Sequence, residues 1–287
     1  MSRPGFTTLL PTERTSSVVF ASPHSGREYS WSFMRRSALS ELAIRSSEDA
    51  FIDKLIDGTP LLGCPTLLAT APRAFVDFNR GEDELDAALI EGVSKSVHNP
   101  RVASGLGVIP RVVANGRAIY RGKLSLIEAR KRIDDYWRPY HTQLQALLTQ
   151  SHAMFGEAIL VDVHSMPTEA LDGVARSSGL RPNVVLGDRF GASANAAIVD
   201  QIEAAFVKAG FVVSRNTPFA GAYITQTYGR PSRGQHAVQV ELDRSLYMSE
   251  ATLTPNANFQ MIRTALLGVM ADIADIGRAA RVPMAAE

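Results

Sequence analysis

Two histidines follow predicted strands, at positions where their side chains could bind a metal ion. His24 stands in a Ser-Pro-His-Ser-Gly run that follows an apolar strand pattern at 17–21. His164 stands in an Asp-Val-His-Ser-Met-Pro run, after a second such pattern at 159–163. Ligands of open α/β sheets gather beyond the carboxyl ends of the strands. A lone loop histidine is more often a structural residue, but two in equivalent positions favour a shared site.

An acidic pair, Glu48-Asp49, offers a third ligand. It opens an apolar pattern at 50–56 that is typical of a helix. The structural interpretation is that both carboxylates stabilise the positive end of that helix. The functional interpretation is that one of them completes a zinc site of two histidines and one acid, the set that leaves a fourth position open for water. Spacing alone does not choose between these interpretations.

Further polar side chains lie after or within other predicted strands. Arg73, Asn79 and Arg80 follow the strand pattern at 65–69. Guanidinium groups can bind a carboxylate bidentately and polarise a carbonyl, although most single arginines form surface salt bridges. Glu241 is flanked by apolar residues in a predicted strand, where a buried carboxylate is costly unless it is paired or catalytic.

The elements that must position these residues alternate along the chain. Short β-branched or apolar runs alternate with longer helical patterns, which predicts an α/β fold with a mainly parallel sheet. Strands are predicted at 17–21, 65–69, 159–163, 183–186, 211–214 and 237–242, and helices at 133–156, 193–210 and 256–278. Residues 214–236, rich in Gly, Pro, Tyr and Thr, are predicted to form a functional loop. No linker-like stretch divides the chain, so we expect one domain over residues 1–287.

Composition excludes several classes of function. The 287 residues include 30 Lys+Arg against 29 Asp+Glu, with no basic block, so we expect no nucleic-acid partner. No apolar run is long enough to cross a membrane or to serve as a signal peptide, which predicts a cytoplasmic protein. The single Cys64 rules out an intrachain disulfide and a multi-thiolate zinc site, so a metal would depend on histidine and carboxylate ligands.

Other catalytic motifs are incomplete. A Gly-Ala-Ser-Ala-Asn run at 191–195 lacks the final glycine of a serine-hydrolase elbow. A Gly-Leu-Gly-Val-Ile-Pro run at 105–110 breaks the dinucleotide-binding pattern, and no phosphate-binding loop motif is present. His141 and His152 lie about three turns apart on one predicted helix, too far to share an ion, so we interpret both as structural.

Four segments, taken in order, resemble the N-formylglutamate amidohydrolase family. They are the runs at 22–26, 76–80 (Val-Asp-Phe-Asn-Arg), 162–167 and 238–241 (Val-Gln-Val-Glu), and the resemblance covers roughly residues 17–250. The family in turn resembles the zinc carboxypeptidases and aspartoacylases. This implies a three-layer α/β/α fold with a mixed, mainly parallel sheet, phosphorylase/hydrolase-like, and a metal-activated water.

The resemblance also implies the metal ligands. His24 and His164 match the two histidine ligands of zinc. Carboxypeptidases place their acidic ligand three residues after the first histidine, but Arg27 occupies that position here. Asp49 is therefore the favoured carboxylate ligand, because the family keeps an acid before an apolar helix, and Glu48 is the alternative.

The remaining roles concern catalysis and substrate binding. By resemblance Glu241 is the general base, and Arg73 is placed like the arginine that polarises the scissile carbonyl. Asn79 and Arg80 match the pair that holds a substrate carboxylate. A dicarboxylate needs a second cation, for which the candidates are Arg111, Arg121, Arg230 and Arg244.

The expected activity is hydrolysis of the formyl amide of N-formyl-L-glutamate to formate and L-glutamate, with one Zn²⁺ per chain and a place in histidine catabolism. Two alternatives stay open. One is a zinc amidohydrolase of the same fold that acts on another N-acyl amino acid or a small peptide. The other is a binding protein that has kept the fold without catalysis.

Overall fold

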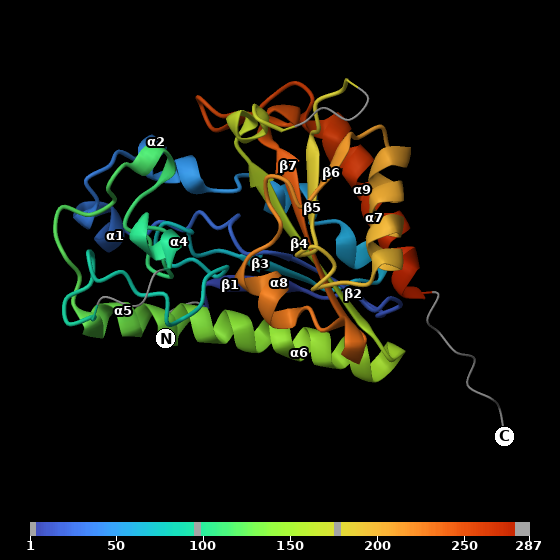
Figure 1. Cartoon of the computed structure of the whole chain (residues 1–287), viewed down its shortest axis with the longest axis horizontal. Helices are drawn as coiled ribbons and strands as arrows, with labels where there is room; N and C mark the ends of the chain where they lie inside the picture. The colour runs from blue at the N-terminus through green and yellow to red at the C-terminus, as the bar shows by residue number, and fades with distance from the viewer. Residues whose placement is uncertain (1–3, 95–98, 175–178, 279–287) are drawn as a thin grey trace.

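The structure of the chain, a computed structural model, describes residues 4–94, 99–174 and 179–278 (Figure 1). These residues form a seven-stranded mixed sheet in the order β1-β3-β2-β4-β7-β5-β6. The strands are β1 (Phe6–Leu9), β2 (Val18–Ser22), β3 (Thr66–Ala69), β4 (Ala158–Met166), β5 (Val184–Gly187), β6 (Val213–Arg215) and β7 (Gln235–Asp243). A separate two-stranded sheet pairs β8 (Met248–Ser249) with β9 (Thr254–Pro255).

Most neighbouring strands of the large sheet run parallel. β2 pairs in parallel with β3 and β4, β4 with β7, and β5 with β6, whereas β1 and β5 run antiparallel to β3 and β7. The predicted α/β class is therefore confirmed. All six predicted strands are present within a few residues, and the structure adds β1, which lies at the edge of the sheet.

Helices cover both faces of the sheet. Figure 1 shows α6 along one face, while α7 and α9 lie together on the other. The helices are α1 (Trp31–Arg36), α2 (Glu41–Ile44), α3 (Ile52–Leu55), α4 (Pro100–Ala103), α5 (Leu126–Arg132), α6 (Arg138–Phe155), α7 (Ala196–Lys208), α8 (Tyr223–Tyr228) and α9 (Phe259–Arg278). No described helix is both long and apolar enough to cross a membrane.

Strand alternation builds two hydrophobic cores. Val18 and Phe20 of β2 pack in the core that contains α7 and α9, while Val19 packs with α6 residues such as Leu144. Because β2 is buried on both faces, its sequence is apolar without alternation, as expected for a central strand of a parallel sheet.

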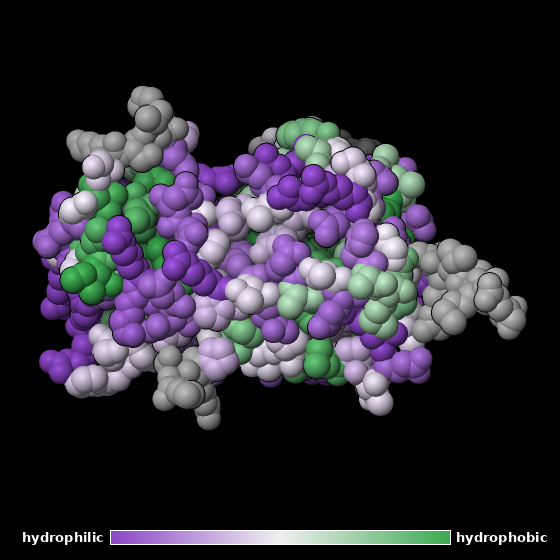
Figure 2. Space-filling model, turned by 90° about the horizontal axis from the view of Figure 1, so that it is seen from below, coloured by the Kyte–Doolittle hydropathy of each residue, from purple (hydrophilic) through white to green (hydrophobic). Residues whose placement is uncertain are grey.

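The helix that crosses the lower face is longer than predicted. α5 begins after Ser125, whose side chain accepts a hydrogen bond from the backbone N–H of Glu128, and a π-helical turn at Ile133–Trp137 joins it to α6. The expected helix at 133–156 missed α5, because that segment is mostly charged. Figure 2 shows this face covered largely by hydrophilic side chains, with separate hydrophobic patches.

Two local predictions need correction. Residues 214–236, predicted as a loop, include α8 and a 3₁₀ turn at Pro231–Arg233. A helix of six residues is too short to show an apolar period between glycines and prolines. The helix expected from the acidic pair is also reduced: α3 begins only at Ile52, and Phe51 before it has a left-handed φ of 68° and makes no side-chain cap. The acidic pair therefore does not cap this helix.

Candidate metal and catalytic site

Two neighbouring parallel strands place four polar side chains at their carboxyl ends. In β4 the residues that face the α6 side are Leu160, then Asp162 and His164, and in β7 they are Ala237, then Gln239 and Glu241. The register pairs Asp162 with Gln239 and His164 with Glu241. Because side chains alternate along a strand, one face changes from apolar core to polar site within these few residues.

The loop after β2 brings His24 to the same place. Gly26 is needed in this loop, since a Cβ at that position would lie 2.1 Å from the carbonyl oxygen of Ala71. The backbone N–H of Asp49 donates to the carbonyl oxygen of His24 at 3.0 Å. This bond places the acidic residue beside the histidine, although the two lie 25 positions apart along the chain.

Three buried candidate ligand atoms face one another. The Nδ1 atoms of His24 and His164 lie 3.1 Å apart, and Oδ2 of Asp49 lies 3.4 Å and 2.9 Å from them, respectively. These residues form a group that could hold a metal ion. Glu48 instead accepts from Nε of Arg45 at 3.0 Å and is absent from this group. The geometry thus favours Asp49 over Glu48 as the carboxylate ligand.

The second nitrogen of each imidazole is bound to another carboxylate. Nε2 of His24 lies 2.7 Å from Asp77, and Nε2 of His164 lies 2.9 Å from Asp162. Such outer carboxylates orient the imidazoles that bind a metal and raise their basicity. Two Nδ1 atoms and one carboxylate oxygen, each held from behind, are a donor set that fits zinc.

Electrostatics keeps two acids of the site, Asp49 and Asp77, ionised. Burial alone would raise the pKa of Asp49, but hydrogen bonds with His164 and His24 lower that pKa well below its usual range. Burial likewise opposes ionisation of Asp77, but the charges of His24 and Arg73 hold its pKa well below normal. Ionised carboxylates are the form that binds a metal or a histidine ligand.

Glu241 and Arg73 face the same cavity. Glu241 is buried and accepts a hydrogen bond from Nε2 of Gln239 at 2.8 Å, and burial raises its pKa to about 7. Nε of Arg73 donates to Oδ2 of Asp77 at 3.0 Å. A carboxyl group whose pKa lies near neutral pH is suited to general acid–base work.

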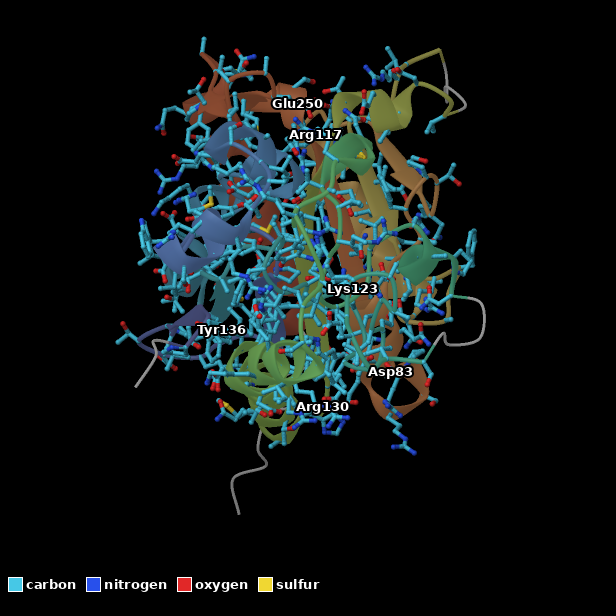
Figure 3. The ribbon with its side chains drawn as sticks, turned by 90° about the vertical axis from the view of Figure 1, so that its left-hand side faces the viewer. Asp83, Arg117, Lys123, Arg130, Tyr136 and Glu250 are labelled. Carbon is cyan, nitrogen blue, oxygen red and sulfur yellow. The ribbon has the colours of Figure 1, made fainter. Side chains whose placement is uncertain are left out.

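The cavity has a volume of about 740 Å³ and lies over the ends of β4 and β7. Its walls include the turn at 112–116 and the segment 218–222, part of the stretch that was predicted to be a functional loop. A second cavity of about 450 Å³ shares Ser46, Asn115 and Arg244 with the first. Arg117 and Glu250, which line this second cavity, are labelled in Figure 3.

Asn79 and Arg80 lie in the wall of the main cavity. Oδ1 of Asn79 accepts from the backbone N–H of Ile224 at 2.8 Å, which fixes the start of α8 against the site. Arg80 is buried, and its Nε and Nη1 donate to the carbonyl oxygens of Leu106 and Asn79 at 2.9 Å and 2.7 Å. No hydrogen bond of Nη2 of Arg80 is found among the described residues, so this nitrogen remains for a ligand.

The arginines proposed from the sequence as a second cation differ in whether they line the cavity. Arg111 pairs with Asp86 at 2.7 Å, and neither it nor Arg121 nor Arg230 lines the cavity. Arg244 lines it, but its Nη2 donates to Oδ1 of Asp49 at 3.2 Å. Arg101, which the sequence did not single out, also lines the cavity.

Other functional candidates were missed for different reasons. Asp162 could have been found, because it lies two positions before His164 on the same strand face. Asp77 lies inside a motif but contacts His24 only through the tertiary fold.

His141, interpreted as structural, is buried between the carbonyl oxygen of Phe78 and the hydroxyl of Tyr228, which agrees with that interpretation.

With this geometry in place, comparison with known proteins identifies the family. The model of the N-formylglutamate amidohydrolase family matches residues 16–248. The chain belongs to this family. It is 30% identical over 236 residues to N-formylglutamate deformylases of Pseudomonas aeruginosa and Pseudomonas putida, covering 81% of this chain and 82% of each relative. The resemblance drawn from four motifs is therefore confirmed.

Solved structures support the same assignment. The crystal structure of N-formylglutamate amidohydrolase from Ralstonia eutropha JMP134 is 32% identical, has a TM-score of 0.89 and matches 96% of this chain and 99% of its own. A gene product of Agrobacterium tumefaciens has a TM-score of 0.66 at 14% identity, with 96% of each chain covered, and it shows the fold alone.

Proposed function

We propose that the protein is a zinc-dependent amidohydrolase that cleaves N-formyl-L-glutamate into formate and L-glutamate. One observation carries this proposal: His24, Asp49 and His164 converge beside Glu241 in a cavity that is also lined by arginines. Membership of the N-formylglutamate amidohydrolase family supports the choice of substrate.

His24 and His164, through Nδ1, and Asp49, through Oδ2, would hold the metal. A zinc ion in such a site supplies Lewis-acid polarisation of the formyl oxygen and lowers the pKa of water toward about 7. Asp77 and Asp162 keep the two imidazoles oriented by binding their Nε2 atoms. A site of two imidazoles and one carboxylate accepts other divalent ions as well, and zinc is the ion we propose.

Glu241 takes a proton from the attacking water and delivers it to the glutamate nitrogen as the amide bond breaks. In support of this role, Glu241 lies opposite His164, one of the proposed metal ligands, in the strand register. Arg73 stabilises the negative charge that develops on the formyl oxygen, a contribution worth about 10²–10³ in turnover for one such donor. Asn79 and Arg80 form the wall that binds a substrate carboxylate.

The substrate assignment is tested by relative kcat/KM. The kcat/KM for N-formyl-L-glutamate should exceed that for N-acetyl-L-glutamate and aminoacyl-glutamate by at least about tenfold, because membership of the N-formylglutamate amidohydrolase family favours the formyl compound. Formate is measured for the first substrate and free glutamate for all three. A higher kcat/KM for the acetyl or aminoacyl compound would move the activity to another N-acyl amino acid.

A further inference from the structure

We propose that Arg101 binds the side-chain carboxylate of the substrate and so selects for an acidic amino acid. This inference rests on the proposed function, because it assigns a second anion contact in the same cavity. It differs from the sequence-based candidates, of which only Arg244 lines that cavity.

The arginines of the cavity fall into two groups. Among the described residues, four arginines line it: Arg73, Arg80, Arg101 and Arg244. Arg73 is paired with Asp77 and Arg244 with Asp49. Within the described ranges neither Arg80 nor Arg101 forms a salt bridge, and the Arg101 side chain donates no hydrogen bond there. Two cations therefore lack carboxylate partners, and a dicarboxylate would supply two.

The two unpaired arginines are joined through the backbone of one residue, Leu106. The backbone N–H of Leu106 donates to the carbonyl oxygen of Arg101 at 2.8 Å, and the carbonyl oxygen of Leu106 accepts from Nε of Arg80 at 2.9 Å. Both side chains thus belong to one wall of the cavity. Burial lowers the pKa of Arg80 most, and repulsion from Arg73 and then from Arg101 lowers that pKa further.

The short helix α4 that carries Arg101 is anchored to the site segment. Oδ1 of Asn99 caps α4 by accepting from the backbone N–H of Arg101 at 3.0 Å, and Nδ2 of Asn99 donates to Glu84 at 3.0 Å. Glu84 follows Asp83, which Figure 3 labels on the side that faces the viewer. The backbone N–H of Val108 donates to the carbonyl oxygen of Glu84 at 3.0 Å. These bonds fix the backbone of Arg101 relative to the segment that carries Arg80.

The buried and exposed positions of the two arginines match the inner and outer carboxylates of the substrate. Arg80 is buried and follows Asn79, whereas Arg101 is exposed. In N-formylglutamate the α-carboxylate is attached to the carbon that bears the formylated nitrogen, and the side-chain carboxylate lies further out. Arg80 therefore receives the carboxylate nearer the scissile bond, and Arg101 receives the outer one.

The test compares N-formyl-L-glutamate with N-formyl-L-glutamine, which lacks the outer charge. Arg101→Ala should lower the ratio of kcat/KM for the glutamate compound to that for the glutamine compound by roughly 10- to 100-fold, mainly through KM, because a hydrogen bond to a charged group is lost. Arg101→Lys should keep part of this ratio. Arg121→Ala removes an exposed charge outside the cavity and should keep the wild-type ratio.

Each outcome has one meaning. An Arg101→Ala protein with the wild-type ratio overturns the Arg101 assignment and leaves the deformylase proposal intact. A wild-type protein that releases formate from neither compound overturns the proposed function instead. Calorimetry of product binding then tests the role of Arg101. Wild-type protein should bind L-glutamate more tightly than L-glutamine, and Arg101→Ala should remove this difference in affinity. The same difference in affinity in both proteins would refute the assignment.

Discussion

In each imidazole of the candidate metal site, the two ring nitrogens have different partners. The Nδ1 atoms of His24 and His164 face Asp49, while the Nε2 atoms bind Asp77 and Asp162. The inner atoms are therefore fixed by groups that do not need to touch the metal. Glu241 has a different environment. Within the described chain its side chain accepts a hydrogen bond from the amide of Gln239, and burial raises its pKa to about 7.

Glu241→Gln tests the role of this residue directly. The amide can still accept the bond from Gln239 but cannot take a proton, so we expect turnover to fall by about 10²–10⁴. Zinc content should stay at the wild-type level, because Glu241 is not one of the proposed ligands. The exposed Glu91→Gln should keep wild-type turnover. Near wild-type turnover of a zinc-loaded Glu241→Gln protein would exclude Glu241 as the base.

At the scale of elements, the sequence was informative wherever a residue's position followed from periodicity. Apolar runs located β2 and β4, and the histidines after or at their ends could be placed at one sheet edge. The acidic pair and the arginines could not be ranked in this way, because Asp49 reaches His24 through a backbone bond and Arg101 reaches the cavity through contacts of Asn99 and Leu106. Such bonds between distant segments leave no periodic signal.

His141 connects three segments of the fold: α6, α8 and the segment around Phe78. Its Nε2 donates to the carbonyl oxygen of Phe78 at 2.9 Å, and its Nδ1 accepts from the hydroxyl of Tyr228 at 2.8 Å. These contacts connect α6 and α8 to the segment that carries Asp77 and Asn79. Burial lowers the pKa of His141 to about 3, so the imidazole is neutral in the folded protein.

The free energy of unfolding should therefore depend on pH through His141. In the unfolded chain a histidine has a pKa of about 6.5, so below that pH the unfolded state binds a proton that the folded state does not. Stability falls as pH decreases from about 6.5 toward 3, by up to about 1.4 kcal/mol per pH unit from this residue. His141→Gln should flatten this dependence in urea unfolding between pH 6 and pH 4.5. Equal slopes for the two proteins would contradict the assignment.

At the scale of the whole molecule, one mixed sheet brings every part of the candidate site together. Its central strands β2, β4 and β7 end at the cavity, and α6, α7 and α9 bury the rest of their length. The fold class followed from the alternation of strand and helix patterns, and four motifs were enough to indicate the family. The antiparallel edge strand β1 and the short helices α1, α2 and α4 were not predicted, because segments of four to six residues carry too little periodicity.

The central claim is that a metal held by His24, Asp49 and His164 is required for formyl hydrolysis. It is tested most directly by elemental analysis of the purified protein, with formate release from N-formyl-L-glutamate measured before chelation, after chelation and after zinc return. We predict about one zinc per chain, loss of formate release on chelation and recovery with zinc. Undiminished formate release from protein shown to contain no metal would contradict the account.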